Sequence, residues 1–174
     1  HLTIDSQSNV IALGDRGTSD AITIVKYDTL GVFQWESFAT STTTALASGG
    51  GITTDDNNNV YVAARWQLDL TAGALPVLAG LTTHTAVMKL DSLGTFLWLS
   101  GSASGSGSNS PTGIVINSNG AVVVSGTFSG TVTFTPLAAF ASGGGGADTD
   151  GFMVSVDNNG VFISTLTGGG NSVV

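Results

Sequence analysis

"KLDSLGTFLW", residues 89–98, decides the fold prediction because the chain contains a near copy of it, "KYDTLGVFQW", at residues 26–35. A weakened third copy, "SVDNNGVFIS", occupies residues 155–164. A second phrase recurs ahead of each copy, as "HLTIDSQSNV" at 1–10, "GITTDDNNNV" at 51–60 and "GIVINSNGAV" at 113–122. Two phrases that return in the same order indicate a repeat, and a repeat governs the whole fold.

The phrases divide the chain into three units, at residues 1–50, 51–112 and 113–174. Alternating β-branched residues and Gly, Asn and Asp turns predict four strands in each unit. In the second unit these are 51–55, 59–66, 84–91 and 95–100, and in the third 113–117, 121–128, 150–157 and 161–167. The first unit is shorter between its two phrases. Residues 129–134 either extend a strand or add a short hairpin, and 101–110 is interpreted as a flexible linker.

Four antiparallel strands repeated about every fifty residues are typical of a β-propeller blade. The predicted fold is therefore all-β, with three four-stranded antiparallel blades of which the first is shortened. Propellers close with about four to eight blades, so three blades predict an incomplete ring or a part of a larger assembly. Further blades of the same protein, a ring of two copies and a head-to-tail filament all remain open. The final "GGGNSVV" suggests a cut or a subunit junction.

The segments "GITTDDNNNVYVAA", "SGTFSGTVTF" and "VMKLDSLGTFLW" resemble the SBBP repeat, a bacterial β-propeller repeat, in three copies. The first unit departs from the pattern because it lacks the middle segment. The third departs because Ser155 replaces Lys and Ser164 replaces Trp. The resemblance implies a propeller fold and an exported or surface protein, and it implies little about function.

The recurrent Asp-x-x-Gly is interpreted as a structural turn. The Asp carboxylate accepts backbone N–H groups within the turn, and Gly takes the positive φ that other residues adopt at a cost. The predicted turn residues are Asp28 and Gly31, Asp91 and Gly94, and Asp157 and Gly160.

The run "DDNNN" at 55–59 is the strongest metal candidate, because Ca²⁺ binds six to eight oxygen ligands. The candidate ligands are Asp55, Asp56, Asn57 and Asn59. The alternating acidic pattern of an EF-hand loop is absent from the run. A turn is the competing interpretation, and no other cofactor is predicted.

Trp66 and His84 are the candidate ligand-binding residues, since an exposed Trp can stack on a sugar or anchor a partner. Core packing is the competing interpretation for Trp66. The sequence contains no Cys and no nucleophile elbow, and the spacing of its acidic residues selects no carboxylate pair. No catalytic residue is therefore predicted.

The charge composition excludes two classes of partner. Twelve acidic residues against four basic ones give a net charge of −8, and the basic residues stand singly. Nucleic-acid binding needs a basic patch, and docking on anionic lipid is disfavoured by the negative charge. No apolar run is long enough to enter a membrane as a helix. The Ser, Thr, Asn and Gly-rich composition favours an extracellular or cell-surface protein of bacterial or archaeal type.

These observations predict a non-enzymatic, exported structural or adhesive module in a multimeric or filamentous surface assembly. A carbohydrate-binding or carbohydrate-cleaving propeller is the first alternative. A Ca²⁺-stabilised extracellular interaction module is the second.

Overall fold

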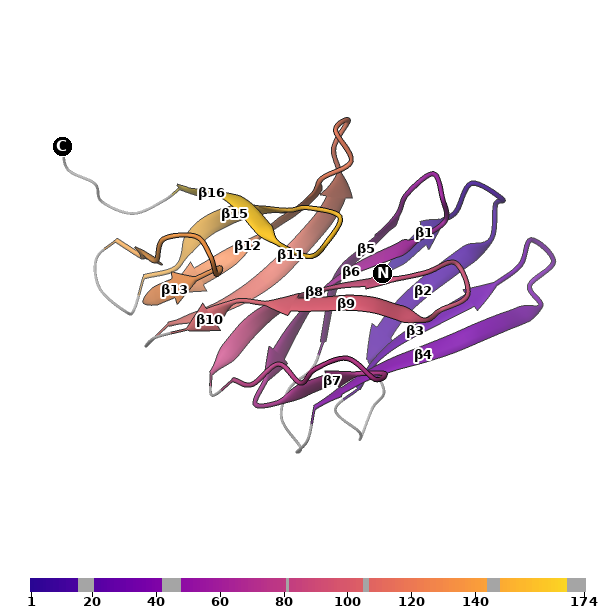
Figure 1. Cartoon of the computed structure of the whole chain (residues 1–174), viewed down its shortest axis with the longest axis horizontal. Coiled ribbons are helices and arrows are strands. Elements are labelled where there is room, and N and C mark those ends of the chain that lie inside the picture. Colours follow the sequence, from indigo (N-terminus) through magenta and orange to yellow (C-terminus); the bar gives the residue numbers. More distant parts are fainter. Residues whose placement is uncertain (16–20, 42–47, 81, 105–106, 144–147, 169–174) are drawn as a thin grey trace.

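The computed structural model describes residues 1–15, 21–41, 48–80, 82–104, 107–143 and 148–168, and these residues form four antiparallel sheets (Figure 1). The N-terminal sheet contains, in spatial order, β1 (Leu2–Ile4), β2 (Val10–Asp15), β3 (Ala21–Tyr27), β4 (Phe33–Ser41) and β7 (Leu70–Ala72). The central sheet contains β5 (Ser48–Thr54), β6 (Val60–Gln67), β8 (Thr83–Leu90) and β9 (Phe96–Gly101).

The C-terminal sheet repeats the order of the central one. It contains β11 (Ser108–Ile116), β12 (Val122–Ser129), β15 (Asp150–Val156) and β16 (Phe162–Gly168). A small fourth sheet contains β10 (Ala103–Ser104), β13 (Thr131–Thr133) and β14 (Phe140–Ala141). The part of the chain that the structure describes contains no helix with the length and hydrophobicity needed to cross a membrane.

The predicted all-β, antiparallel fold is confirmed, and the strands predicted in the second and third units match the observed ones to within a few residues. Two details differ. The predicted linker at 101–110 contributes the end of β9, all of β10 and the start of β11 within its described residues. Residues 129–134 both end β12 and form β13, which pairs with β14 in a short hairpin.

The middle segment of each longer unit pairs with a strand of the unit before it. β7 pairs with the end of β4 through Leu70↔Ser41 and Ala72↔Ala39. In the same way β13 pairs with β10, which continues the chain beyond β9. We call β7 and β13 the latch strands, because each adds a strand from one unit to the last strand of the preceding unit. The N-terminal sheet therefore has five strands, against the four predicted.

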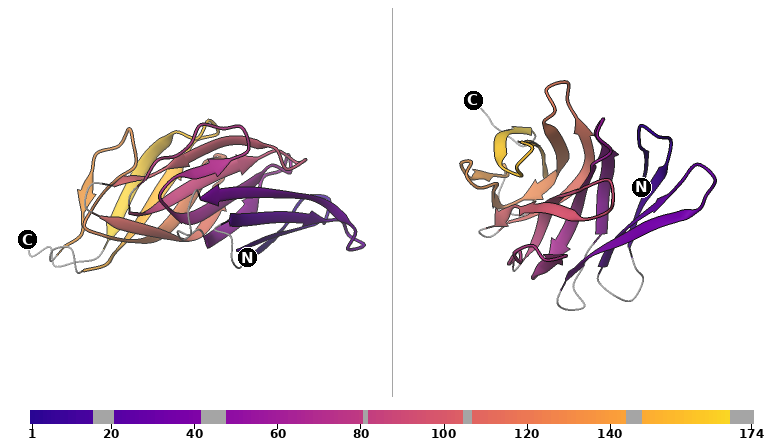
Figure 2. Two further views of the ribbon diagram at one scale, coloured as in Figure 1. Left: turned by 90° about the horizontal axis from the view of Figure 1, so that it is seen from below. Right: turned by 45° about the vertical axis from the view of Figure 1, so that its right-hand side comes forward.

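The three large sheets follow one another in chain order, with their first strands in contact (Figures 1 and 2). Two apolar clusters fill the spaces between them. The first cluster includes Ile11 and Ile24 of the N-terminal sheet with Val60 and Met88 of the central sheet. The second includes Tyr61 of the central sheet with residues of the C-terminal sheet, among them Val122 and Val154. Within the described residues no sheet closes into a barrel or a propeller ring.

Candidate functional site

The turn after the first strand of each large sheet is fixed by one acidic or amide side chain. In the central sheet, Asp55 Oδ1 accepts the backbone N–H of Asn57 at 2.9 Å and of Asn59 at 2.8 Å. Asp55 Oδ2 also accepts the Asn59 side-chain amide at 2.8 Å. Asp5 and Asn117 accept from the residues two and four further on in the same way. The polar run at 55–59 is thus held together by its own hydrogen bonds.

The Asp-x-x-Gly turns agree with the structural role expected of them. Asp91 Oδ1 accepts the N–H of Leu93 at 2.9 Å and of Thr95 at 2.8 Å, while Gly94 has a φ of +86°. The other two turns have the same geometry, through Asp28 with Gly31 and Asp157 with Gly160.

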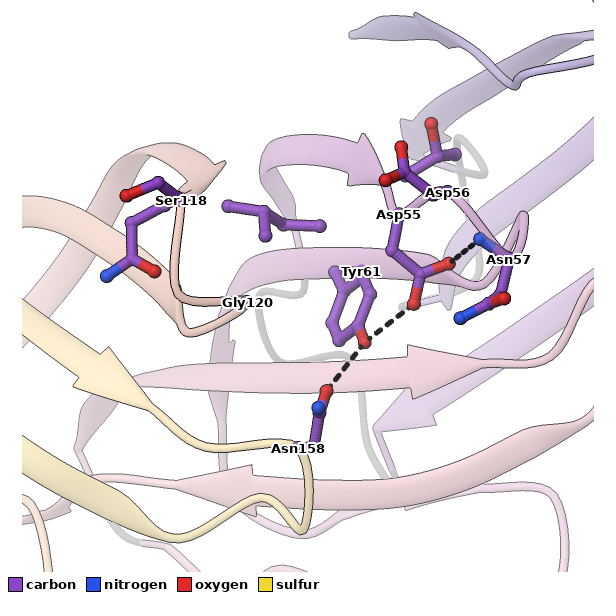
Figure 3. A pocket seen from close by; sticks show the side chains of 10 residues that line it. Asp55, Asp56, Asn57, Tyr61, Ser118, Gly120 and Asn158 are labelled. Carbon is purple, nitrogen blue, oxygen red and sulfur yellow. Dashed lines mark hydrogen bonds between the residues drawn. The ribbon is translucent and has the colours of Figure 1, made fainter.

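A polar pocket of about 460 Å³ lies between the turns of the central and C-terminal sheets (Figure 3). Asp55, Asp56 and Asn57 line it from one sheet, and Asn117 and Asn158 line it from the other. Carboxylate and amide groups of this kind suit a small polar ligand. The pocket is therefore a candidate for binding.

Tyr61 forms the floor between the two sheets, and its side chain is almost fully buried. Its hydroxyl lies 3.1 Å from Asp55 Oδ2 and 3.2 Å from Asn158 Oδ1. Burial first, and then the nearby Asp55 carboxylate, raise the pKa of the Tyr61 hydroxyl well above its usual value. The hydroxyl is therefore a neutral donor, and it links the turns of two sheets rather than supplying a base.

The four candidate calcium ligands are close together but unequally available. Asp55 and Asn59 are engaged in the turn, whereas Asp56 and Asn57 are exposed. Among the described residues no group of three or more His, Cys, Asp or Glu side chains is placed to hold a metal ion. Calcium binding stays a prediction.

Trp66 and His84 lie opposite each other on β6 and β8, in the core of the molecule. Their rings stack with centroids 4.8 Å apart, and the two residues are only 1% and 2% exposed. Burial lowers the pKa of His84, against the opposing effect of a backbone hydrogen bond with Ser102. A sugar cannot reach either ring face in this arrangement, so the geometry gives their proposed role in ligand binding no support.

Sequence reasoning missed the roles of Lys26 and Tyr61, which bind the turn carboxylate after the first strand of the N-terminal and the central sheet, respectively. Lys26 Nζ forms a buried ion pair with Asp5 Oδ2 at 2.7 Å. In the central sheet the equivalent carboxylate, that of Asp55, accepts a hydrogen bond from the Tyr61 hydroxyl instead. Lys89 lies over the Tyr61 ring, with Nζ 5.0 Å from the ring centroid. The signal was available in the recurrence of Lys two residues before the turn Asp in both full copies of the phrase.

The joint between large sheets is the geometry that recurs most closely. Trp35 Nε1 donates to the Ser92 carbonyl oxygen at 3.0 Å, and Ser37 Oγ donates to that of Gly94 at 2.6 Å. At the next joint Trp98 Nε1 donates to Asn158 O at 2.9 Å, and Ser100 Oγ donates to Gly160 O at 2.6 Å. Both joints thus connect the last strand of one repeat unit's phrase, β4 or β9, to the Asp-x-x-Gly turn of the next sheet.

No protein-family model matches the chain, and a search of curated proteins finds no significant match.

Proposed function

We propose that this chain is a non-enzymatic structural or adhesive module of the β-propeller type, which acts in a multimeric assembly at the cell surface. The observation that carries the proposal is the use of the repeated phrase. Its Trp, Asp and Gly residues serve the joints between sheets, so the most recurrent side chains are committed to architecture.

The chemistry of the described residues supports the same proposal. His84 is buried against Trp66, and Lys26 is paired with Asp5 in the interior. The His84 ring and the Lys26 ammonium therefore lie away from solvent. The acidic, Lys-poor composition supports export, and the open outer sheets support assembly.

Sedimentation velocity over a range of concentrations, followed by negative-stain electron microscopy, tests the proposal. We expect particles larger than one chain, in the form of rings or filaments. A stable monomer at every concentration would contradict the assembly role.

Carbohydrate binding is the second candidate function. Its proposed site is the polar pocket beside Tyr61, because Trp66 and His84 are stacked and buried. The exposed side chain of Asn158 lies in this pocket, while Asn159 lies outside it. A glycan array tests the proposal, because Asn158→Ala is expected to abolish any binding and Asn159→Ala to preserve it. Equal effects of the two substitutions, or no binding by the unmodified chain, would remove this candidate.

A further inference from the structure

The outer face of the N-terminal sheet exposes apolar residues at positions whose equivalents in the other two large sheets are buried. We call this the head face, and it contains Leu2, Ile4, Val10, Ala12, Val25 and Tyr27. Val10 and Tyr27 are 37% and 38% exposed, whereas their equivalents Val60 and Leu90 in the central sheet are fully buried. Leu2 is 72% exposed, and its equivalent Ile52 is 8% exposed.

The outer face of the C-terminal sheet, at the other end of the molecule, also exposes apolar residues, and it corresponds to the opposite face of the sheet. This tail face contains Val115, Val123, Ser125, Met153, Ser164 and Leu166. Met153 is 45% exposed, although its equivalents Ile24 and Val87 are fully buried. Leu166 is 68% exposed. At both internal joints a face of the tail type packs on a face of the head type, so the two free faces are complementary in kind.

The two ends also lack matching halves of the latch. β2 ends at Asp15 and β3 begins at Ala21, so this connection is much shorter than the one between β6 and β8 that carries β7. In the third unit Gly168, which begins a run of glycines, stands at the position of Ala39, which pairs with the latch strand β7 in the first unit. The two ends thus differ from the internal joints at both positions that a latch involves.

The Trp joint is absent from the tail as well. Ser164 and Leu166 replace the Trp and Ser that make both internal joints. At Gly31, a Cβ atom would meet no described atom within 4 Å, whereas at Gly94 it would lie 2.8 Å from the Trp35 ring. A contact between tail and head would thus rest on apolar packing without the indole.

We infer that the head face binds the tail face of a second copy of this chain. This inference rests on the proposed function and specifies its partner and its polarity. Because the contact joins two different surfaces, it extends either into a closed ring of a few copies or into a filament.

Two single substitutions and their mixture test the inference. Leu2→Glu places a carboxylate in the head face, and Leu166→Glu places one in the tail face. Each variant alone is expected to associate at least tenfold more weakly than the unmodified chain in sedimentation velocity. An equimolar mixture is expected to form a 1:1 complex, because each variant keeps the face that the other has lost.

Leu93→Glu is the matched control, since Leu93 is also highly exposed but lies on a turn of the central sheet. It is expected to associate like the unmodified chain. Ile4→Glu with Met153→Glu provides a second pair if either first variant fails to melt cooperatively. A mixture that stays monomeric, or single variants that associate normally, would overturn the inference. The proposed function would still stand if the unmodified chain assembled through other surfaces. An unmodified chain that never associates would overturn both.

Discussion

Trp35 donates its indole N–H to the carbonyl oxygen of Ser92, 57 residues further along the chain, at 3.0 Å. The bond joins β4 of one sheet to a turn of the next, and it recurs between Trp98 on β9 and Asn158. The turn glycine beside each acceptor leaves room for the ring, because a Cβ at Gly94 would lie 2.8 Å from Trp35 and one at Gly160 would lie 3.0 Å from Trp98. Indole, turn and glycine therefore act as one joint.

Alanine at two turn glycines separates backbone strain from packing. Gly31 and Gly94 both have positive φ, so alanine costs each turn about 1 kcal/mol. At Gly94 the added methyl also overlaps Trp35, which adds about 1–3 kcal/mol. We expect Gly94→Ala to lower the free energy of unfolding in urea by more than Gly31→Ala. Equal losses of unfolding free energy in the two variants would show that the packing of the Trp35 ring does not require glycine at position 94.

The buried pair of Asp5 and Lys26 predicts acid sensitivity. Burial raises the pKa of Asp5, but hydrogen bonds from Lys26, Asn9 and Gln7 outweigh it and hold the pKa below its usual value. The resulting stabilisation is present above the unfolded pKa of about 3.9. It is lost as the pH falls through the lower folded value.

Asp5→Asn is therefore expected to flatten the dependence of unfolding free energy on pH below about pH 4. It also leaves Lys26 buried without its carboxylate, which costs about 3 kcal/mol at neutral pH. Urea unfolding at a series of pH values measures both effects. Asp56→Asn, at an exposed position of the neighbouring turn, is the control and should leave the slope unchanged.

His84 predicts a second pH effect, in a higher range. Burial lowers the pKa of His84 in the folded chain, so the unfolded chain takes up a proton first as the pH falls below about 6.5. The melting temperature should therefore fall from pH 7 towards pH 5. His84→Phe keeps a ring against Trp66 and should abolish that fall, while His1→Gln, at the exposed first residue, should not. The same fall in the His84→Phe variant would refute this assignment.

Calcium is expected to have no effect on stability. The Asp55 carboxylate already accepts hydrogen bonds from Asn57, Asn59 and Tyr61, so a cation would have to displace them. We expect the melting temperature to be the same in millimolar calcium and in chelator. A rise of several degrees in calcium that disappears in Asp55→Asn would instead support the calcium prediction.

The sequence predicts local structure well because its turns are repeated. Asp91 and Gly94 recur at fixed spacing in all three units, and the structure forms the same turn each time. The apolar run that begins at Val60, bounded by the polar turn before it, equally predicts β6. Such features depend on neighbours in the chain, which a sequence displays directly.

Features that depend on distant partners were missed. β7 was not predicted, because three residues, Leu70 to Ala72, pair with β4 of another unit and carry no strand pattern of their own. Trp66 looked like a binding residue because it stands outside the repeated phrase, yet His84 and the neighbouring sheet bury it. Tyr61 acquired its role through Asn158, which lies 97 residues away.

Restoring the Trp joint at the tail gives the last prediction. Ser164 and Leu166 occupy the positions of Trp98 and Ser100, whose side chains each donate one hydrogen bond to the next sheet. Each such bond contributes about 1 kcal/mol, and the indole adds buried apolar area. If the tail face meets the head face of a second copy, Ser164→Trp with Leu166→Ser should strengthen association by roughly tenfold or more.

The association constant from sedimentation equilibrium measures this change. Adding Leu2→Glu to the same chain should remove the gain, because the strengthened tail would then meet a charged head. Ser164→Trp alone should give an intermediate value, since it restores the indole without the hydroxyl. A double variant that associates no better than the unmodified chain would show that the tail does not approach the Asp28–Gly31 turn as Trp98 approaches the turn at Asn158.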